Sequence, residues 1–386
     1  MPSTKGKPVM PKITTNRNLI DRITDKENIY DAYKQTLVGD SKYKIDAMLF
    51  SIDETYNLMK LRQSLLDKTY AFDNYEEFYV MEPKERLIHA PSYKDKIVQL
   101  AINNVLKEIY NPSFIYDSYA CIDNKGTHKC VDRISYFMRK AKWQYGEDAY
   151  IIKMDIEKFF YTIDREILKE MIRKKIDCEE TLNLIFKIVD SADMIDYRGL
   201  PLGNTLSQLF ANVYMNEMDQ YAKRKLGLKF YVRYADDTII IVKDKETANE
   251  VLDGLIEFYK KVLNLTMSLD KTKIFPIAQG VNAIGFKIHT THRLLRNDSK
   301  KKIKRKSKRF PDSIAEGRMT IEKAEQILNS WLGHAEHGNS YNFIQSLLAR
   351  NDYLYLNHKG VFKIDATKIG RSNKDGVLQG QSMEFA

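Results

Sequence analysis

Apolar residues recur along this chain with two different periods, which distinguish predicted helices from predicted strands. Between residues 98 and 109 they recur every three or four positions, which predicts a helix with one buried face. The same spacing predicts further helices over residues 19–70, after Asp164, from residue 205, over 245–263, over 320–333 with Gly333 as the stop, and near 340–349.

Short runs of β-branched and aromatic residues predict the strands. Residues 78–91 predict two strands separated by a proline-broken turn. Residues 150–155 predict a buried strand that delivers an acid at its end. Residues 281–288 predict another strand, in which Gly285 marks the close approach of a backbone or a ligand.

The run from Tyr231 to Val242 predicts a β-hairpin with two adjacent acids, Asp236 and Asp237, at its tip. Neighbouring strand residues point to opposite faces, so a turn is needed to bring both carboxylates to one place. Together with Asp155 they would form a site for hard divalent cations, which prefer oxygen ligands. An isolated Asp-Asp pair is more often only a polar turn. Features elsewhere in the chain are therefore needed to choose between a turn and a metal site.

Net charge narrows the class of partner. The 386 residues include 62 Lys and Arg against 52 Asp and Glu, a formal net charge of +10. This balance favours a polyanion, either nucleic acid or an anionic membrane surface. No apolar run approaches the roughly 18 residues of a membrane span. Three cysteines without zinc spacing fit a reducing cytoplasm.

The positive charge is concentrated in one segment, residues 296–309, where nine of fourteen residues are Lys or Arg. A charge run is usually a solvated face, but this density in a basic protein predicts contact with a phosphate backbone. The nine residues are Arg296, Lys300, Lys301, Lys302, Lys304, Arg305, Lys306, Lys308 and Arg309.

Two other segments carry candidate ligand contacts. Lys84 and Arg86 lie at the predicted hairpin tip, where cations could clamp a triphosphate, although a solvated turn is the commoner case. Gly203 opens a helix and would allow close backbone approach to a ligand. Asn204 or Thr205 would cap that helix.

These features follow one another in the order found in a reverse transcriptase, and the chain resembles that family over about residues 75–345. Asp155 with Phe159-Phe160 resembles the first catalytic motif. Tyr234-Ala235-Asp236-Asp237 resembles the Tyr-x-Asp-Asp box, and Ile284-Gly285-Phe286 resembles the primer grip. The resemblance implies an α+β right-hand polymerase with fingers, palm and thumb, whose antiparallel palm sheet carries the hairpin.

The resemblance also implies how the chain is divided. We expect a flexible basic leader, N-terminal helices with fingers, a palm containing part of the fingers (165–200), a helical basic thumb and a partly disordered C-terminal extension. The leader is residues 1–18, the N-terminal helices with fingers are 19–149 and the palm is 150–290. The thumb is 291–350 and the extension is 351–386.

For the site, the resemblance implies two Mg²⁺ ions, or Mn²⁺ in their place, held by Asp155, Asp236, Asp237 and the backbone carbonyl of Ile156. Lys271 is a candidate general acid for pyrophosphate, with a surface lysine in a turn as the alternative. The resemblance places further residues at the dNTP: Lys84 and Arg86 on its phosphates, Phe160 as a steric gate against a 2′-OH, and Leu202, Gly203 and Gln208 around it.

Within reverse transcriptases, residues 203–208 resemble the Gly-x-x-x-Ser-Gln of diversity-generating retroelements, as do Ser118–Cys121, Gly126–His128 and Ser330–Ala335. Leu202 stands where most relatives have Gln, and its apolar side chain predicts error-prone copying. The expected partners are a structured RNA template, a DNA or RNA primer, dNTPs and a small accessory protein. Three alternatives stay open: an antiphage-defence enzyme copying a noncoding RNA, a non-catalytic RNA-binding module and a maturase-like RNA-folding partner.

Overall fold

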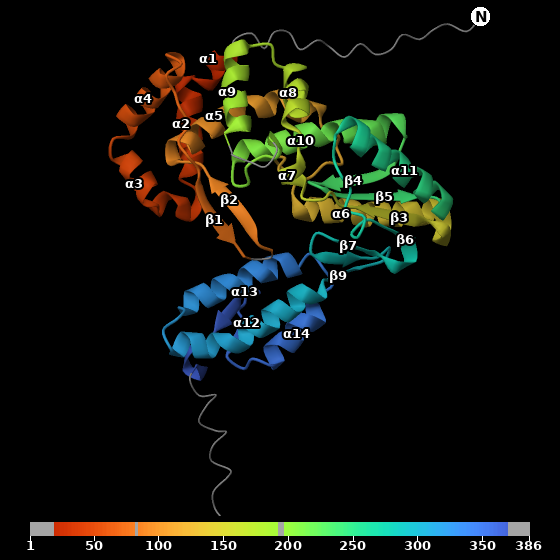
Figure 1. The fold of residues 1–386 in the computed structure, drawn as a ribbon. Coiled ribbons are helices and arrows are strands. Elements are labelled where there is room, and N and C mark those ends of the chain that lie inside the picture. Colours follow the sequence, from red (N-terminus) through yellow and green to blue (C-terminus); the bar gives the residue numbers. More distant parts are fainter. Residues whose placement is uncertain (1–18, 82–83, 192–196, 370–386) are drawn as a thin grey trace, which may run out of the picture. The chain divides into compact units, whose positions relative to one another are not determined.

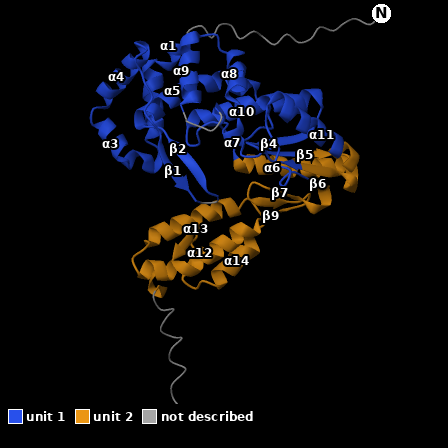
Figure 2. Cartoon of the chain, in the orientation of Figure 1, with its two compact units in different colours: residues 1–126, 153–240, 249–273 blue, residues 127–152, 241–248, 274–386 orange. Residues whose placement is uncertain are grey.

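The computed structural model describes residues 19–81, 84–191 and 197–369 (Figure 1). The chain divides into two compact units that interleave along the sequence (Figure 2). Unit 1 comprises residues 1–126, 153–240 and 249–273, and unit 2 comprises residues 127–152, 241–248 and 274–386. The expected leader (1–18) and the end of the expected extension (370–386) lie outside the described residues, and the five expected regions stay a prediction.

Unit 1 begins with helices, as the apolar spacing predicted. They are α1 (Leu19–Ile23), α2 (Lys26–Thr36), α3 (Ile45–Ile52) and α4 (Glu54–Leu66). The longer α5 (Tyr93–Tyr110) starts where the Ser92 side chain accepts a hydrogen bond from the Asp95 amide. The predicted stripe, Val98 to Ile109, is its buried face, which packs against α2 and α10.

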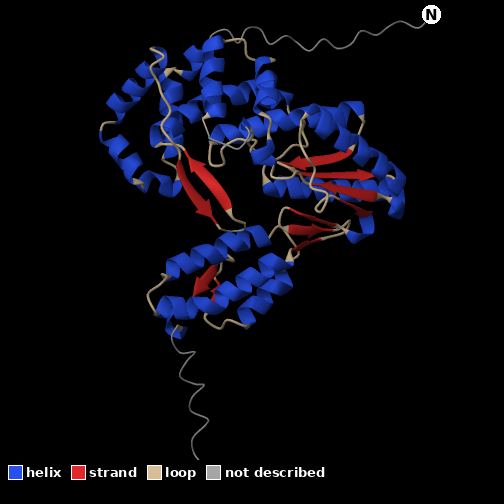
Figure 3. Cartoon of the chain, viewed as in Figure 1, coloured by secondary structure: helices blue, strands red, loops and turns tan. Residues whose placement is uncertain are grey.

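Strand β1 (Glu76–Val80) pairs antiparallel with β2 (Arg86–Ala90), with Phe78 opposite Ile88. This is the hairpin predicted over residues 78–91 (Figure 3). All five residues of β1 and the first residue of β2 are exposed, so pairing between the two strands rather than burial defines the element.

A four-stranded sheet has the order β4 (Phe230–Tyr234), β5 (Asp237–Val242), β3 (Tyr150–Met154) and β6 (Lys273–Pro276). The aliphatic residues of β3, β4 and β5 are buried, whereas Ile274 and Phe275 of β6 are half-buried. Helices follow its strands in the sequence: α7 (Phe159–Thr162), α8 (Arg165–Arg173), α9 (Glu179–Asp190), α10 (Thr205–Gln220) and α11 (Lys245–Val262). The Asn204 side chain caps α10, as predicted.

Unit 2 contains α6 (Thr127–Tyr145) and a three-stranded antiparallel sheet of β7 (Val281–Ala283), β8 (Phe286–Ile288) and β9 (Arg293–Leu295). The prediction of one strand over residues 281–288 was wrong. Ile284 and Gly285 both have positive φ, 46° and 85°, and form a tight turn between β7 and β8. The apolar run continues through this turn, so periodicity alone did not reveal it.

The rest of unit 2 is a small helical bundle of α12 (Asn297–Ala315), α13 (Ile321–Ala335) and α14 (Tyr341–Ala349). The predicted stop at Gly333 was wrong, because α13 continues to Ala335, which is fully buried. A hairpin of β10 (Leu354–Leu356) and β11 (Phe362–Ile364) completes the core. Asn329 of α13 bonds both the N–H and the C=O of Phe362.

Short 3₁₀ segments lie at Gly39–Tyr43, Asn111–Ser113, Gly146–Asp148, Ile277–Gln279 and Ala366–Lys368, and a π-helical turn at Tyr221–Lys225 follows α10. The structure confirms the α+β class with antiparallel strand pairs and many helices. Among the described residues, no helix combines the length and the apolar character needed to cross a bilayer.

Candidate active site

Asp155 is the first residue after β3, as predicted, and a neighbouring segment fixes its backbone. The Asp155 carbonyl accepts a hydrogen bond from the Ser268 amide at 2.9 Å, and Ile156 forms an antiparallel bridge with Met267. This docking brings Lys271 to the acid, because its Nζ donates to Asp155 Oδ1 at 2.6 Å. The hydrogen bond to Asp155 raises the pKa of Lys271 above its usual range.

Asp236 and Asp237 lie at the turn between β4 and β5, as predicted. Ala235, which precedes them, has a φ of 54° in the left-handed region. Burial raises the pKa of the Asp236 carboxyl, and the negative charges of Asp237 and Asp155 raise it further. Strands β3 and β5 are neighbours in the sheet, so the segment ending at Asp155 lies next to the strand that begins at Asp237. Lys153, which the sequence did not single out, has its Nζ 3.8 Å from Asp237 Oδ1.

The donor set fits a hard divalent cation, because three carboxylates concentrate negative charge and offer only oxygen ligands. Within the described ranges, however, no three His, Cys, Asp or Glu side chains are already arranged as a metal site. Lysines hold two of the carboxylates instead. A cation at Asp155 would therefore share this carboxylate with Lys271 or take its place.

Backbone hydrogen bonds gather several residues predicted to line the nucleotide site. The Leu200 amide donates to the Phe160 carbonyl at 2.7 Å, and the His89 amide of β2 donates to the Leu202 carbonyl at 2.7 Å. The loop before α10 thus ties Phe160 and Leu202 to the strand that begins at Arg86. Both side chains are half-buried. Lys84, Arg86 and Gln208 are exposed.

Gly203 makes a close approach, but to a strand of its own unit. A Cβ added at Gly203 would lie 2.9 Å from the His89 carbonyl oxygen and 2.9 Å from Ile88 Cγ2, and its φ is +106°. The close approach that the structure shows at Gly203 is to β2. A nucleotide contact at Gly203 stays a prediction.

The two residues predicted as a primer grip differ in position: Gly285 lies in a turn, whereas the Phe286 side chain is buried. Gly285 lies in the β7–β8 turn, where an added Cβ would come within 2.7 Å of His334 Nε2. Phe286 is fully buried, and its ring centroid lies 4.4 Å from that of His334. The Phe286 side chain therefore supports the turn and does not reach solvent.

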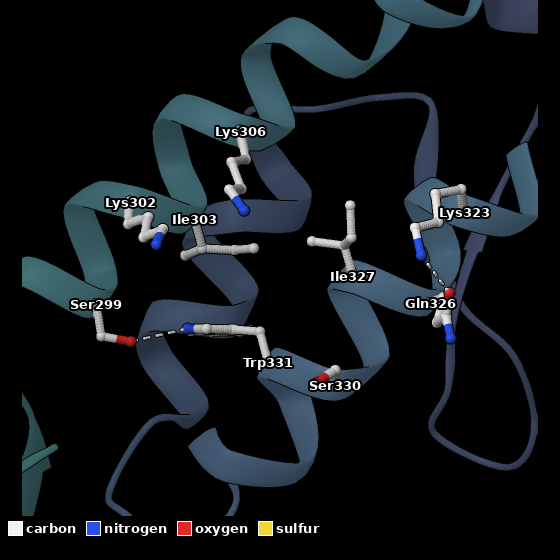
Figure 4. A pocket seen from close by; sticks show the side chains of 9 residues that line it. All are labelled: Ser299, Lys302, Ile303, Lys306, Lys323, Gln326, Ile327, Ser330 and Trp331. Carbon is white, nitrogen blue, oxygen red and sulfur yellow. Dashed lines mark hydrogen bonds between the residues drawn. The ribbon is translucent and has the colours of Figure 1, made fainter. Parts of the chain in front are cut away.

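The basic segment begins at Arg296 and continues into α12. Ile303, Ser307 and Phe310 form its buried face, so the lysines and arginines occupy the other faces. A groove of about 390 Å³ runs between α12 and α13 (Figure 4). Lysines from both helices and an apolar floor line it; its residues are Ser299, Lys302, Ile303, Lys306, Lys323, Gln326, Ile327, Ser330 and Trp331.

In this groove, Trp331 Nε1 donates to Ser299 Oγ at 3.1 Å, which fixes the indole ring along one wall (Figure 4). The side chains of Lys302 and Lys306 extend from α12 toward α13. Among the described residues no acidic side chain lines the groove, so its electrostatic potential favours an anion.

Sequence reasoning missed a buried ion pair behind the acid-bearing turn. Arg233 and Asp219 are both 0% exposed, and their side chains are 2.7 Å apart at Arg233 Nη2 and Asp219 Oδ2. A signal was present, because Arg233 interrupts a run of apolar strand residues and Asp219 follows Met218 in a buried helix.

Known proteins resemble this chain over most of its length. Residues 81–288 match the family described as reverse transcriptase (RNA-dependent DNA polymerase). Protein YkfC of Escherichia coli is 24% identical over 333 residues, which cover 74% of this chain and 84% of that protein. The group II intron-encoded protein LtrA of Lactococcus lactis is 25% identical over 302 residues, 60% of this chain; the chain spans about half of LtrA, 49%.

Among solved structures, apo telomerase from Candida Tropicalis aligns with a TM-score of 0.46 and 14% identity, over 78% of this chain and 64% of that one. The family match carries the assignment, because it covers more than half of the chain and includes the strand end at Asp155 and the Asp236-Asp237 turn. The chain belongs to the reverse transcriptase family.

Proposed function

We propose that this protein is an RNA-directed DNA polymerase. In the reaction, the 3′-hydroxyl oxygen of a primer bonds to the α-phosphorus of a dNTP, and the bond from that phosphorus to the bridging oxygen breaks. The hydroxyl proton passes to water, and pyrophosphate leaves. The observation that supports the proposal is that Asp155 follows β3 and Asp236-Asp237 precede or begin β5, the neighbouring strand of the same sheet, together with Lys271 on Asp155.

Two Mg²⁺ ions, or Mn²⁺ in their place, would be held by Asp155, Asp236, Asp237 and the Ile156 carbonyl, and when bound they activate the hydroxyl and neutralise phosphate charge. Lys271 stays protonated at neutral pH, because its pKa is raised. Half of its side chain is exposed, so it is free to exchange Asp155 for pyrophosphate and deliver a proton there.

The residues around the loop before α10 would select the nucleotide. Phe160 would exclude a 2′-OH by contact with the sugar, and Leu202, beside it, would offer only apolar contact to the base pair. A site that makes no hydrogen bond to the pair does not penalise a mispair through a lost one. Gln208 and the exposed cations Lys84 and Arg86 would complete the site at the triphosphate.

The basic face of α12 and the groove beside it would bind the nucleic acid. Lysines spaced along one helix neutralise successive phosphates, whereas a tryptophan over an apolar floor fits an unpaired base by stacking. The β7–β8 turn would contact the primer through its backbone, since Phe286 is buried.

We further propose which kind of RNA the protein copies. Residues 203–208 and Leu202 support error-prone copying in a diversity-generating retroelement. The similarity to a group II intron-encoded protein favours a second candidate, a reverse transcriptase that works on an intron-like structured RNA. An antiphage-defence enzyme copying a noncoding RNA would use the same site. Sequencing the RNA and cDNA that copurify with the protein distinguishes the three.

Primer extension tests the activity. The protein, a primed RNA template, dNTPs and Mg²⁺ should give template-length DNA, and Asp236→Ala should give none. Equal incorporation by both proteins would overturn the proposal. Omission of dNTPs in favour of rNTPs should abolish extension if Phe160 acts as the gate.

A further inference from the structure

The turn that carries Asp236 is held in a conformation that its own residues do not favour. Ala235 has a φ of 54°, a left-handed conformation that glycine adopts readily and alanine does not. An outside contact must therefore keep this turn in place.

That contact is a hydrogen bond from Arg233. Its Nη1 donates to the Ala235 carbonyl at 3.0 Å, so the guanidinium holds the peptide unit that links Ala235 to Asp236. Arg233 is three residues before Asp236 on β4, and its own backbone is fixed on both sides. Its amide donates to the Asp117 carbonyl, and its carbonyl accepts from the Tyr119 amide, both at 3.0 Å.

The guanidinium itself has no freedom to move. Nε and Nη2 donate to the two oxygens of Asp219, at 2.8 and 2.7 Å. Nη1 also donates to Asn212 Oδ1 at 3.2 Å, and Nη2 donates to Ser118 Oγ at 2.9 Å. With the Ala235 carbonyl, all five N–H groups of Arg233 have acceptors.

Burial makes this arrangement strong and specific. Arg233 and Asp219 are both fully buried, so water does not screen their attraction, and removal of either partner leaves an uncompensated charge. Tyr231 also donates to Asp219 Oδ1, at 2.7 Å, through a hydroxyl that is not part of the Arg233–Ala235 hydrogen bond. The pair thus joins α10 rigidly to the acid-bearing turn through one planar side chain.

We propose that Arg233 and Asp219 form a positioning pair that holds the Ala235 peptide and thereby places the Asp236 carboxylate for catalysis. Neither residue touches the reacting groups. The catalytic consequence rests on the proposed polymerase function, whereas the structural consequence, a turn held by Arg233, does not.

Arg233→Lys tests the proposal, because it keeps a positive charge beside Asp219. A single ammonium on a shorter side chain does not reproduce the planar fork that reaches both Asp219 and Ala235. Tyr231→Phe is the matched control, since it removes a bond to the same carboxylate and leaves the turn contact intact. The measurements are thermal unfolding, kcat and dNTP KM in primer extension, and amide hydrogen exchange over residues 234–237.

We expect Arg233→Lys to lower kcat about 10- to 100-fold with dNTP KM changed less than about 3-fold, as a misplaced catalytic group does. Exchange at residues 234–237 should become faster. Tyr231→Phe should leave kcat and the exchange rate at residues 234–237 unchanged, whatever its effect on thermal unfolding. A kcat for Arg233→Lys within about 2-fold of Tyr231→Phe, with equal exchange at the turn, would overturn the proposal.

If Arg233→Lys does not fold, the double variant Arg233→Met/Asp219→Asn replaces it. That variant buries no charge and leaves an amide oxygen for Tyr231, yet it removes the donor to Ala235. We expect the same lower kcat and faster exchange at residues 234–237 in this variant. A kcat and exchange rates equal to those of the wild-type protein would overturn the proposal. If the wild-type protein itself does not extend a primer, the polymerase proposal fails, and hydrogen exchange alone decides the positioning pair.

Discussion

Lys271 Nζ lies 2.6 Å from Asp155 Oδ1, although 116 positions separate the two residues in the sequence. The contact is possible because residues 266–268 bond along residues 155–157 and carry the lysine to the acid. Lys271 is half exposed and Asp155 is 15% exposed, so the ion pair can open toward solvent. Lys271, the predicted general acid, is therefore in contact with Asp155, a predicted metal ligand.

The first prediction concerns the carboxylates. Asp236→Asn should lower primer extension by roughly 10³-fold or more, because the amide keeps the shape of the side chain but loses its negative charge. Asp270→Asn, an exposed acid next to Lys271, is the control with the same chemical change. Steady-state extension on primed RNA measures both. Comparable rates for the two variants would place the chemistry elsewhere.

The second prediction concerns Lys271. Lys271→Ala should lower kcat by about 100-fold if the lysine donates a proton to pyrophosphate. Lys271→Arg should keep the ion pair with Asp155 but recover only part of kcat, since arginine does not give up its proton. Lys273→Arg, two residues away and exposed, should have no effect. Full activity in Lys271→Ala would leave Lys271 as a surface ion-pair residue.

The third prediction concerns copying accuracy. Leu202→Gln should lower the error rate, because a hydrogen-bonding side chain beside the nascent pair is left unpaired by a mismatch. The reduction should be about 10-fold, as expected for about 1.4 kcal/mol of added discrimination. Sequencing of primer-extension products measures it, with Leu202→Met as the apolar control. The role of Leu202 is refuted by equal error spectra in all three proteins.

The fourth prediction concerns the groove between α12 and α13. The chain has two tryptophans, so Trp143→Phe leaves Trp331 as the only one, and Trp143 is exposed on α6. Single-stranded oligonucleotides should quench Trp331 fluorescence by stacking. Adding Lys302→Ala and Lys306→Ala should weaken binding and reduce the salt slope by about 2, one for each phosphate contact.

The control for the groove replaces two exposed lysines of α11, Lys245 and Lys260, by alanine. It removes the same charge from another element and should leave the quenching unchanged. Equal loss of affinity in both double variants would mean that only net charge matters. Absence of quenching would exclude a base in the groove.

The fifth prediction concerns Gly203. Gly203→Ala should destabilise unit 1 by about 2–4 kcal/mol, because it combines a positive φ with a clash against β2. Gly227→Ala is the control, because Gly227 also has a positive φ, +64°, but nothing lies within 4 Å of an added Cβ; it should cost only about 1–2 kcal/mol. Urea unfolding of both variants checks the difference. Equal costs would mean that β2 moves aside without penalty.

Local sequence patterns were sufficient to predict a helix or strand whose own residues show a clear apolar periodicity. The Asp236-Asp237 hairpin, the strand ending at Asp155 and the amphipathic α5 were all predicted, because strand alternation and helical spacing are written in consecutive residues. The turn at Ile284 and Gly285 was missed for the same reason, since an apolar run continues through it. Gly333 was misread because an exposed glycine inside a helix resembles a helix stop.

The sequence by itself identified the residues proposed to carry the chemistry, because an acid at a strand end and two acids at a hairpin tip are visible in consecutive residues. Tertiary structure alone decided which residues serve those carboxylates. It placed Lys271 on Asp155, Arg233 under the Asp236 turn and β2 against Gly203. These contacts join segments that local periodicity does not connect. Burial, which strengthens the Arg233–Asp219 pair, is likewise a property of the packed chain.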